Sequence, residues 1–158
     1  MTTQLLPMSE HSFAGFFELA VSNYAHDNVA AGRWPAADGL ALARSESERL
    51  LPAGLATPDH HFFDIVEVES GRVAGHLWMA AMARGSSRIA YVYQVMVKPA
   101  FQRRGHARAA LLAAEQQARA LGLSGMALHV FGFNAGAQAL YASLGYQVSS
   151  LNLAKQLA

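Results

Sequence analysis

The chain has 158 residues, 53% of them hydrophobic and 15% charged, a composition typical of a folded domain rather than a disordered chain. The absence of cysteine excludes a disulfide framework, a thiolate nucleophile and any cysteine-ligated metal site. No apolar run approaches the about 18 to 20 residues of a membrane span, and residues 1–10 lack the basic start and apolar stretch of a signal peptide. We therefore expect a single domain over residues 1–158, located in the cytoplasm.

The net charge of +1 is distributed unevenly along the chain. Residues 1–69 carry ten acidic and three basic residues, a net of −7, whereas residues 70–158 carry one acidic and nine basic residues, a net of +8. A basic half favours an anionic ligand, and an acidic half favours a cationic one or is a solvated surface. Nucleic acid is not expected as the anion, because the basic residues form no stripe with interleaved aromatic side chains.

The first half of the chain predicts two helices. Apolar side chains from Phe13 to Tyr24 recur at spacings of three and four, the period of one helix face, and Gly32 ends this pattern. A second helix is predicted from Pro35 to Leu51, because proline suits a first helical turn and Pro52 stops the helix. A short strand at residues 4–6 can precede both helices.

From residue 61 onward, β-branched and aromatic residues between turn signals indicate strands. Short connections between the first three strands imply an antiparallel meander. The whole pattern predicts an α/β (α+β) fold, in which helices flank a mixed, mostly antiparallel sheet. The elements predicted here are strands at 62–68, 73–83 and 89–97, a helix at 105–121, a strand at 126–131, a helix at 135–144 and a last strand from Tyr146.

The segment most informative about chemistry is Gln102-Arg103-Arg104-Gly105-His106-Ala107-Arg108, between a predicted strand and a predicted helix. A helix start exposes unpaired backbone N–H groups and the positive end of the helix dipole, and both favour phosphate binding. A glycine lets the backbone approach a diphosphate closely, while the arginines add positive charge. An ordinary basic helix start is the alternative. Neither a P-loop nor a dinucleotide-binding glycine motif is present.

This segment resembles the pyrophosphate loop of the GNAT superfamily of acyl-CoA-dependent N-acetyltransferases, Q/R-x-x-G-x-G/A, which Gln102 to Ala107 match in full. The resemblance extends from Ile89 to Tyr146, and the first half is similar to small bacterial GNAT proteins of undefined substrate. It implies the GNAT fold, with acetyl-CoA as co-substrate, an amine as acceptor and no metal.

The resemblance also implies roles for individual residues. The backbone of the strand over 95–97 pairs with the pantetheine arm, the amides of residues 103–108 hold the pyrophosphate, and Tyr141 protonates the departing thiolate. A plain core strand, an N-cap role for Asn134 and a buried structural tyrosine are the alternatives. The implied cofactor-binding residues are Val95, Met96, Val97, Gln102, Arg103, Arg104, Gly105, His106, Ala107, Arg108, Asn134 and Tyr141.

His129 is the candidate general base. It lies five residues before Asn134, matching a position where some family members carry a catalytic glutamate, and an imidazole generally titrates near neutrality. A histidine between Leu128 and Val130 that faces away from the active site, or that is satisfied in the core, is the alternative. The candidate acceptor-binding residues, each of which can instead belong to the core, are Tyr24, Trp34, Trp78, Tyr93 and Gln94.

The sequence thus predicts an enzyme that moves an acetyl group from acetyl-CoA to a primary amine of a small molecule or peptide, by direct attack in a ternary complex. The alternatives are a non-catalytic acyl-CoA-binding or regulatory module of the same fold and a transferase that uses another acyl-CoA donor. Tyr141 favours the enzyme, because a module that only senses the cofactor has no chemical need of a phenol there. No nucleic acid or membrane partner is expected, and a homodimer is compatible with these features.

Overall fold

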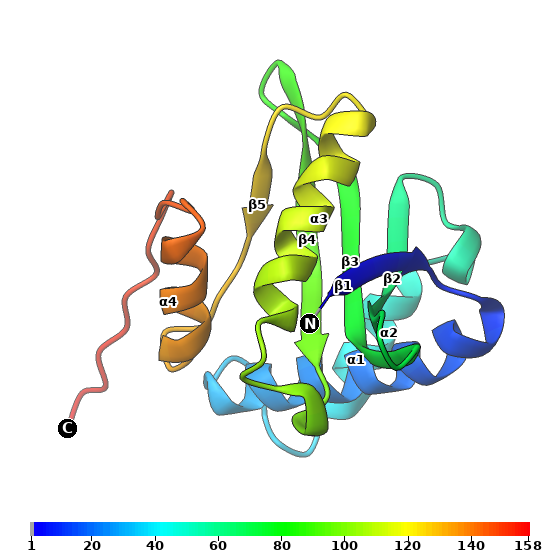
Figure 1. Cartoon of the computed structure of the whole chain (residues 1–158). Coiled ribbons are helices and arrows are strands. Elements are labelled where there is room, and N and C mark those ends of the chain that lie inside the picture. The colour runs from blue at the N-terminus through cyan, green and yellow to red at the C-terminus, as the bar shows by residue number, and fades with distance from the viewer. Residues whose placement is uncertain (1) are drawn as a thin grey trace.

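The computed structural model describes residues 2–158, and its centre is a five-stranded sheet with helices on both faces (Figure 1). The mixed α/β fold expected from the sequence is confirmed. Within residues 2–158, no helix combines the length and the apolar character needed to cross a membrane. The elements are β1 (Thr3–Pro7), α1 (Glu10–Ala30), α2 (Gly39–Leu50), η1 (Gly54–Ala56), β2 (His60–Glu67), β3 (Arg72–Arg84), β4 (Ser87–Val97), η2 (Pro99–Phe101), α3 (His106–Ala120), β5 (Met126–Leu128) and α4 (Ala135–Ser143).

The strands follow the order β1-β2-β3-β4-β5 across the sheet. The pairs from β1 to β4 are antiparallel, and β4 pairs with β5 in parallel. The predicted meander of β2, β3 and β4 is therefore confirmed, and α3 forms the crossover that a parallel pair requires. The register of β3 with β4 slips between Trp78 and Met79, so that Tyr93 is an extra residue in β4.

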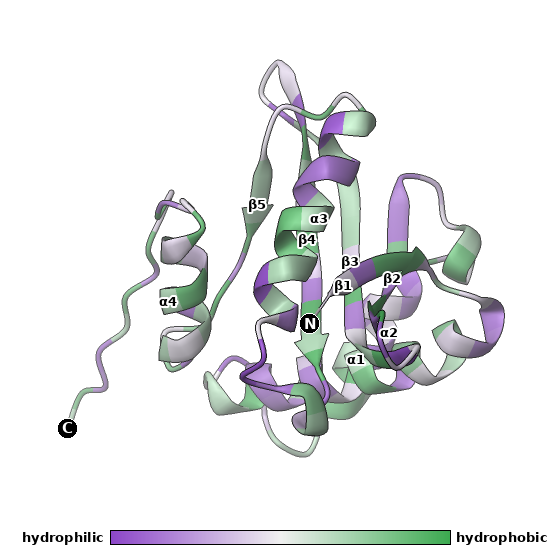
Figure 2. Cartoon of the chain, viewed as in Figure 1, coloured by the Kyte–Doolittle hydropathy of each residue, from purple (hydrophilic) through white to green (hydrophobic). Residues whose placement is uncertain are grey.

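The two faces of the sheet are covered by different helices (Figure 1). On one face, Ala110, Leu111 and Ala114 of α3 belong to the same buried cluster as sheet residues such as Leu77 and Met79. On the other face, aromatic side chains of α1 pack against Phe62 and Trp78. Figure 2 shows hydrophilic residues gathered in the loop that leads into α3 and mainly hydrophobic residues along the middle of the sheet.

The starts of the two N-terminal helices differ in how well the sequence predicts them. Ser9 caps α1, because its Oγ accepts a hydrogen bond of 3.1 Å from the Ser12 N–H. The second helix begins at Gly39 and not at Pro35, so the predicted start is wrong by one helical turn. Residues 35–38 form a turn instead, with the Asp38 N–H donating to the Pro35 carbonyl at 3.1 Å.

The C-terminal part departs most from the sequence-based expectation. The predicted strand at 126–131 is shortened to Met126–Leu128, and the predicted last strand from Tyr146 is wrong. Gly145, with a φ of +91°, turns the chain so that Tyr146 packs on Tyr141, and residues 147–158 are then exposed. A strand needs a neighbouring backbone, and no strand of the described chain pairs with this segment.

Candidate active site

The loop before α3 presents open backbone at the start of the helix. Gly105 is the N-cap of α3 with a φ of +84°, and a Cβ built on it would meet no atom within 4 Å. A glycine is therefore favoured here because it adopts the left-handed conformation without strain, and its missing side chain leaves open space in front of the helix. The first helical hydrogen bond runs from the Ala109 N–H to the Gly105 carbonyl at 3.0 Å. The amides of residues 106–108 precede that bond and can bind an anion.

Close to this loop, β4 and β5 separate. They pair only through Ala90–Val92 and Met126–Leu128, so residues 93–97 of β4 have no ladder partner on that side among residues 2–158. The extra residue Tyr93 is a β-bulge, which bends its strand and increases the local twist. The unpaired edge of β4 can bind an extended ligand as an added strand does.

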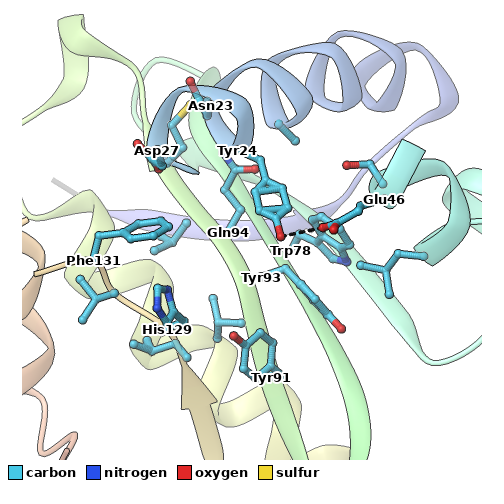
Figure 3. A pocket seen from close by; sticks show the side chains of 18 of the residues that line it. Asn23, Tyr24, Asp27, Glu46, Trp78, Tyr91, Tyr93, Gln94, His129 and Phe131 are labelled. Atoms are coloured by element: carbon cyan, nitrogen blue, oxygen red, sulfur yellow. Dashed lines mark hydrogen bonds between the residues drawn. The ribbon is translucent and has the colours of Figure 1, made fainter. Parts of the chain in front are cut away.

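A cleft of about 710 Å³ lies where β4 and β5 separate (Figure 3). One face of α1 forms a wall of it, because Ala20, Asn23, Tyr24 and Asp27 follow the three- and four-residue spacing of helix neighbours. The other lining residues are Arg33, Glu46, Ser47, Arg49, Leu50, Trp78, residues 91–96, residues 128–131, Asn134 and Tyr141.

Aromatic side chains of the sheet form another wall of the cleft. Trp78 and Tyr93 are stacked with centroids 4.5 Å apart, and Tyr91 meets Tyr93 edge-on at 4.8 Å. The Trp78 indole N–H donates a hydrogen bond of 3.0 Å to His60 Nδ1, which fixes the orientation of the indole. Tyr93 and Gln94 line the cleft within a continuous run from residue 91 to residue 96. Burial raises the pKa of Tyr91 and of Tyr93.

Two half-buried carboxyl groups line the cleft, on α1 and α2. Burial raises the pKa of Asp27, and nearby His26 partly offsets this effect. Glu46 accepts a hydrogen bond of 2.9 Å from the Tyr24 hydroxyl, drawn dashed in Figure 3. Burial and this bond raise the pKa of Tyr24. Sequence reasoning missed both carboxyl groups, although the position of Asp27, three residues after Tyr24 on the same helix face, is a signal that could have found it.

Asn134 and Tyr141 both line the cleft, as their spacing of seven residues on one helix predicts. Asn134 also caps α4, because its Oδ1 accepts a hydrogen bond of 3.1 Å from the Ala137 N–H. Burial raises the pKa of Tyr141, so its phenol stays protonated well above neutral pH. The side chain is thus available as a proton donor at the cleft.

His129 is exposed and lines the cleft from the chain after β5. Its ring meets the Phe131 ring edge-on, with centroids 4.7 Å apart. The interpretation of His129 as a core histidine is therefore wrong. In Figure 3, His129 and Phe131 lie on the same side of the cleft as Asp27, whereas Glu46 lies beyond Tyr24.

Several predicted residues lie outside the cleft lining or turn their side chains elsewhere. Gln102 Nε2 donates to the Val97 carbonyl at 2.9 Å, and Arg108 donates to Ser143 Oγ at 2.8 Å. His106 is buried in the interior at the start of α3, with 1% of its surface exposed. Trp34 does not line the cleft but packs on Tyr24, with ring centroids 5.2 Å apart.

Over residues 2–158, no group of three or more histidine, aspartate or glutamate side chains is placed to hold a metal ion.

The chain is similar to known proteins over nearly its full length. The sequence profile of the acetyltransferase (GNAT) family matches residues 26–146. The uncharacterized N-acetyltransferase YycN of Bacillus subtilis strain 168 is 32% identical over 157 residues, which cover 99% of this chain and 100% of YycN. The uncharacterized N-acetyltransferase YdgE of the same organism is 31% identical, with 99% of each protein covered. The crystal structure of YycN matches this fold with a TM-score of 0.93 over 99% of both chains.

Proposed function

The chain belongs to the acetyltransferase (GNAT) family, and from this premise we propose that the enzyme moves an acetyl group from acetyl-CoA to a primary amine of a small molecule or peptide. The observation that carries this proposal is the separation of β4 and β5 into a cleft beside the open start of α3. In this proposal, the edge of β4, the amides at the start of α3 and the Tyr141 phenol act on one bound donor.

In this proposal, the donor is held mainly by backbone groups. The edge of β4 at Val95, Met96 and Val97 has no ladder partner on the β5 side among residues 2–158, and it pairs with the amides of the pantetheine arm. The Val97 carbonyl exchanges its bond to Gln102 for one to this arm. The amides of residues 106–108 bind the pyrophosphate, with positive charge from the exposed Arg103 and from the helix dipole. The open space at the Cβ position of Gly105 supports this assignment, because no neighbouring atom there blocks the approach of a phosphate group to the backbone.

Direct attack of the amine needs a base and a proton donor, which are His129 and Tyr141 in this proposal. His129 first takes a proton from the ammonium form of the acceptor and releases it to solvent, and the resulting neutral amine attacks the thioester carbonyl. As the carbon–sulfur bond breaks, Tyr141 gives its phenolic proton to the departing sulfur. The attacking nitrogen loses its second proton as the amide forms, and through solvent this proton restores the Tyr141 phenol. Starting from the ammonium form, the products are the amide, the thiol of coenzyme A and one free proton.

We further propose that the acceptor is cationic before it reacts. The half-buried carboxyl groups of Asp27 and Glu46 attract a cation, and the stacked rings of Trp78 and Tyr93 form the wall beside them. Arg33 and Arg49 also line the cleft but are exposed, so solvent screens their charge more strongly. Tyr24 and Gln94 complete this part of the cleft as contacts for the body of the acceptor.

A turnover screen tests the proposed function. Purified enzyme is incubated with acetyl-CoA and panels of monoamines, diamines, amino acids and basic peptides, with mass detection of product and colorimetric detection of the released thiol. We expect an acetylated product with cationic primary amines, and a lower rate with amines that carry a carboxylate. Propionyl-CoA and succinyl-CoA in parallel identify the donor. Binding of coenzyme A without turnover of any amine would instead support a non-catalytic module.

A further inference from the structure

One carboxylate oxygen contacts the side chains on both sides of Gly105. Glu67 ends β2, and its side chain is only 9% exposed. Its Oε1 lies 3.5 Å from Arg104 Nη1 and 3.6 Å from His106 Nε2, the residues immediately before and after the glycine. Its Oε2 accepts a hydrogen bond of 2.6 Å from Ser70 Oγ in the turn between β2 and β3. The carboxylate is therefore held by the sheet while it contacts the loop.

The His106 side chain is fully buried, between α3 and the first strands of the sheet. Its Nδ1 lies 2.9 Å from Thr3 Oγ1 on β1, and its ring meets Phe101 edge-on at 6.0 Å. Neither His106 Nε2 nor Glu67 Oε1 has a hydrogen-bond partner among the described residues. Because a buried polar atom without a partner is unfavourable, we assign the hydrogen of the imidazole to Nε2, facing the carboxylate.

The loop needs such support because its backbone is unusual. Arg103 has a φ of +62° and Gly105 a φ of +84°, both in the left-handed region. A residue other than glycine adopts this region at a cost and keeps it only where its surroundings enforce it. The Gln102 bond to the Val97 carbonyl fixes the start of the loop, and the Glu67 contacts fix the part around Gly105.

We propose that Glu67 is a positioning residue for the pyrophosphate loop, holding Arg104 and His106 so that the amides at the start of α3 face one anion. Glu67 does not line the cleft and touches neither donor nor acceptor in this assignment. Its effect is therefore confined to the phosphate-bearing part of the donor. The inference rests on the proposed function, since it requires that this loop binds the pyrophosphate of coenzyme A.

The test compares two donors that share the thioester and the pantetheine arm. Acetyl-CoA carries the pyrophosphate, and S-acetylpantetheine does not. We expect Glu67→Gln to raise the Kd for coenzyme A and the KM for acetyl-CoA by about tenfold or more, the effect expected from losing one contact to a charged group that orders the loop. The same variant should leave kcat/KM for S-acetylpantetheine unchanged.

Glu69→Gln is the matched control for this substitution. Glu69 is an exposed glutamate two residues further along the chain, and its Oε1 accepts a hydrogen bond of 2.7 Å from the Thr2 N–H. Like His106, which contacts Thr3, Glu69 has a hydrogen-bond partner in the N-terminal segment. Unlike Glu67, it does not contact the loop before α3. We expect no change in the affinity for coenzyme A.

The outcomes separate this inference from the proposed function. Equal coenzyme A affinity in the parent and in Glu67→Gln would overturn the positioning role alone, and so would an equal loss with both donors. A parent that binds no coenzyme A, or a folded Gly105→Glu variant with undiminished affinity, would overturn the loop assignment itself.

A second variant keeps the test decisive if Glu67→Gln does not fold. Ser70→Ala, at an exposed residue, removes the bond that orients the carboxylate together with the 3.3 Å bond that Ser70 Oγ accepts from the Arg72 N–H in the same turn. We expect a smaller loss of coenzyme A affinity in the same direction, and faster hydrogen exchange at the amides of residues 105–108. Unchanged exchange together with unchanged affinity would overturn the proposal.

Discussion

Tyr141 and Tyr146 stand with their ring centroids 5.7 Å apart, and of the two only Tyr141 lines the cleft. Burial raises the pKa of both phenols, and that of Tyr146 reaches about 12 with added effects of Glu115 and Tyr141. The Tyr146 hydroxyl is buried without a hydrogen-bond partner in the described part of the chain. Tyr141 is therefore a candidate proton donor at the cleft, and Tyr146 is a neighbouring buried phenol outside the cleft lining that serves as its control.

Tyr141→Phe should lower kcat by roughly 10² to 10⁴, with little change in the affinity for acetyl-CoA, because the substitution removes only a proton donor. Tyr146→Phe should keep kcat and leave stability unchanged or improved, since it removes a buried hydroxyl that has no partner. Steady-state rates and thermal unfolding of both variants measure these effects. Equal kcat for Tyr141→Phe and the parent, with chemistry shown to be rate-limiting, would mean that another group protonates the thiolate.

Gly105→Glu should abolish the binding of coenzyme A. The new side chain would stand in the open space before α3, strain a backbone with a φ of +84°, and bring a negative charge to the start of the helix. Gly85→Glu is the control, because Gly85 has a φ of +60° in the β3–β4 turn and equally open surroundings. Calorimetric titration with coenzyme A should show loss of binding in the first variant and parental affinity in the second.

Asp27→Asn and Glu46→Gln should each raise the KM for a cationic acceptor by about tenfold, the loss expected for one hydrogen bond or ion pair to a charged group. The KM for acetyl-CoA should stay unchanged. Glu48→Gln is the control, because Glu48 is exposed on α2 and does not line the cleft. An unchanged KM in both cleft variants, measured with the preferred acceptor, would contradict the proposed cationic acceptor.

The elements around the donor site are predictable because their signals are local in sequence. The strand over 89–97 follows from its β-branched and aromatic residues, and the helix after Gly105 follows from alanine- and leucine-rich periodicity. The spacing of Asn134 and Tyr141 also predicts that they share a helix face, as they do. In each case the information lies within a few helical turns or one strand.

The remaining features depend on contacts between distant segments, which one sequence does not reveal. The carboxylate of Glu67 meets His106 only because β1 and β2 lie beside α3 in the folded chain. Asp27 lines the cleft because the packing of α1 on the sheet selects which helix face meets it. The alternating residues after Tyr146 resemble a strand, but strand formation requires a backbone partner that the local pattern does not specify.

His129 is the proposed base, and its exposed position makes a clean test possible. Because the side chain contacts Phe131 at the surface of the cleft and is not in the core, His129→Gln should not destabilise the fold. If His129 takes the proton of the amine, the kcat/KM of the parent should show an ascending limb with rising pH that His129→Gln lacks. His11→Gln, at an exposed histidine of α1 outside the cleft, is the control.

Two acceptors of different amine pKa complete this measurement. A limb that stays at the same pH with both acceptors and disappears only in His129→Gln identifies His129 as the base. A limb that moves with the acceptor means that the amine reaches the cleft already deprotonated. Asp27 lines the same cleft and has a pKa raised by burial, so Asp27→Asn is measured in parallel. If the limb persists in His129→Gln and disappears in Asp27→Asn, the carboxylate of α1 takes the proton and the assignment of His129 is wrong.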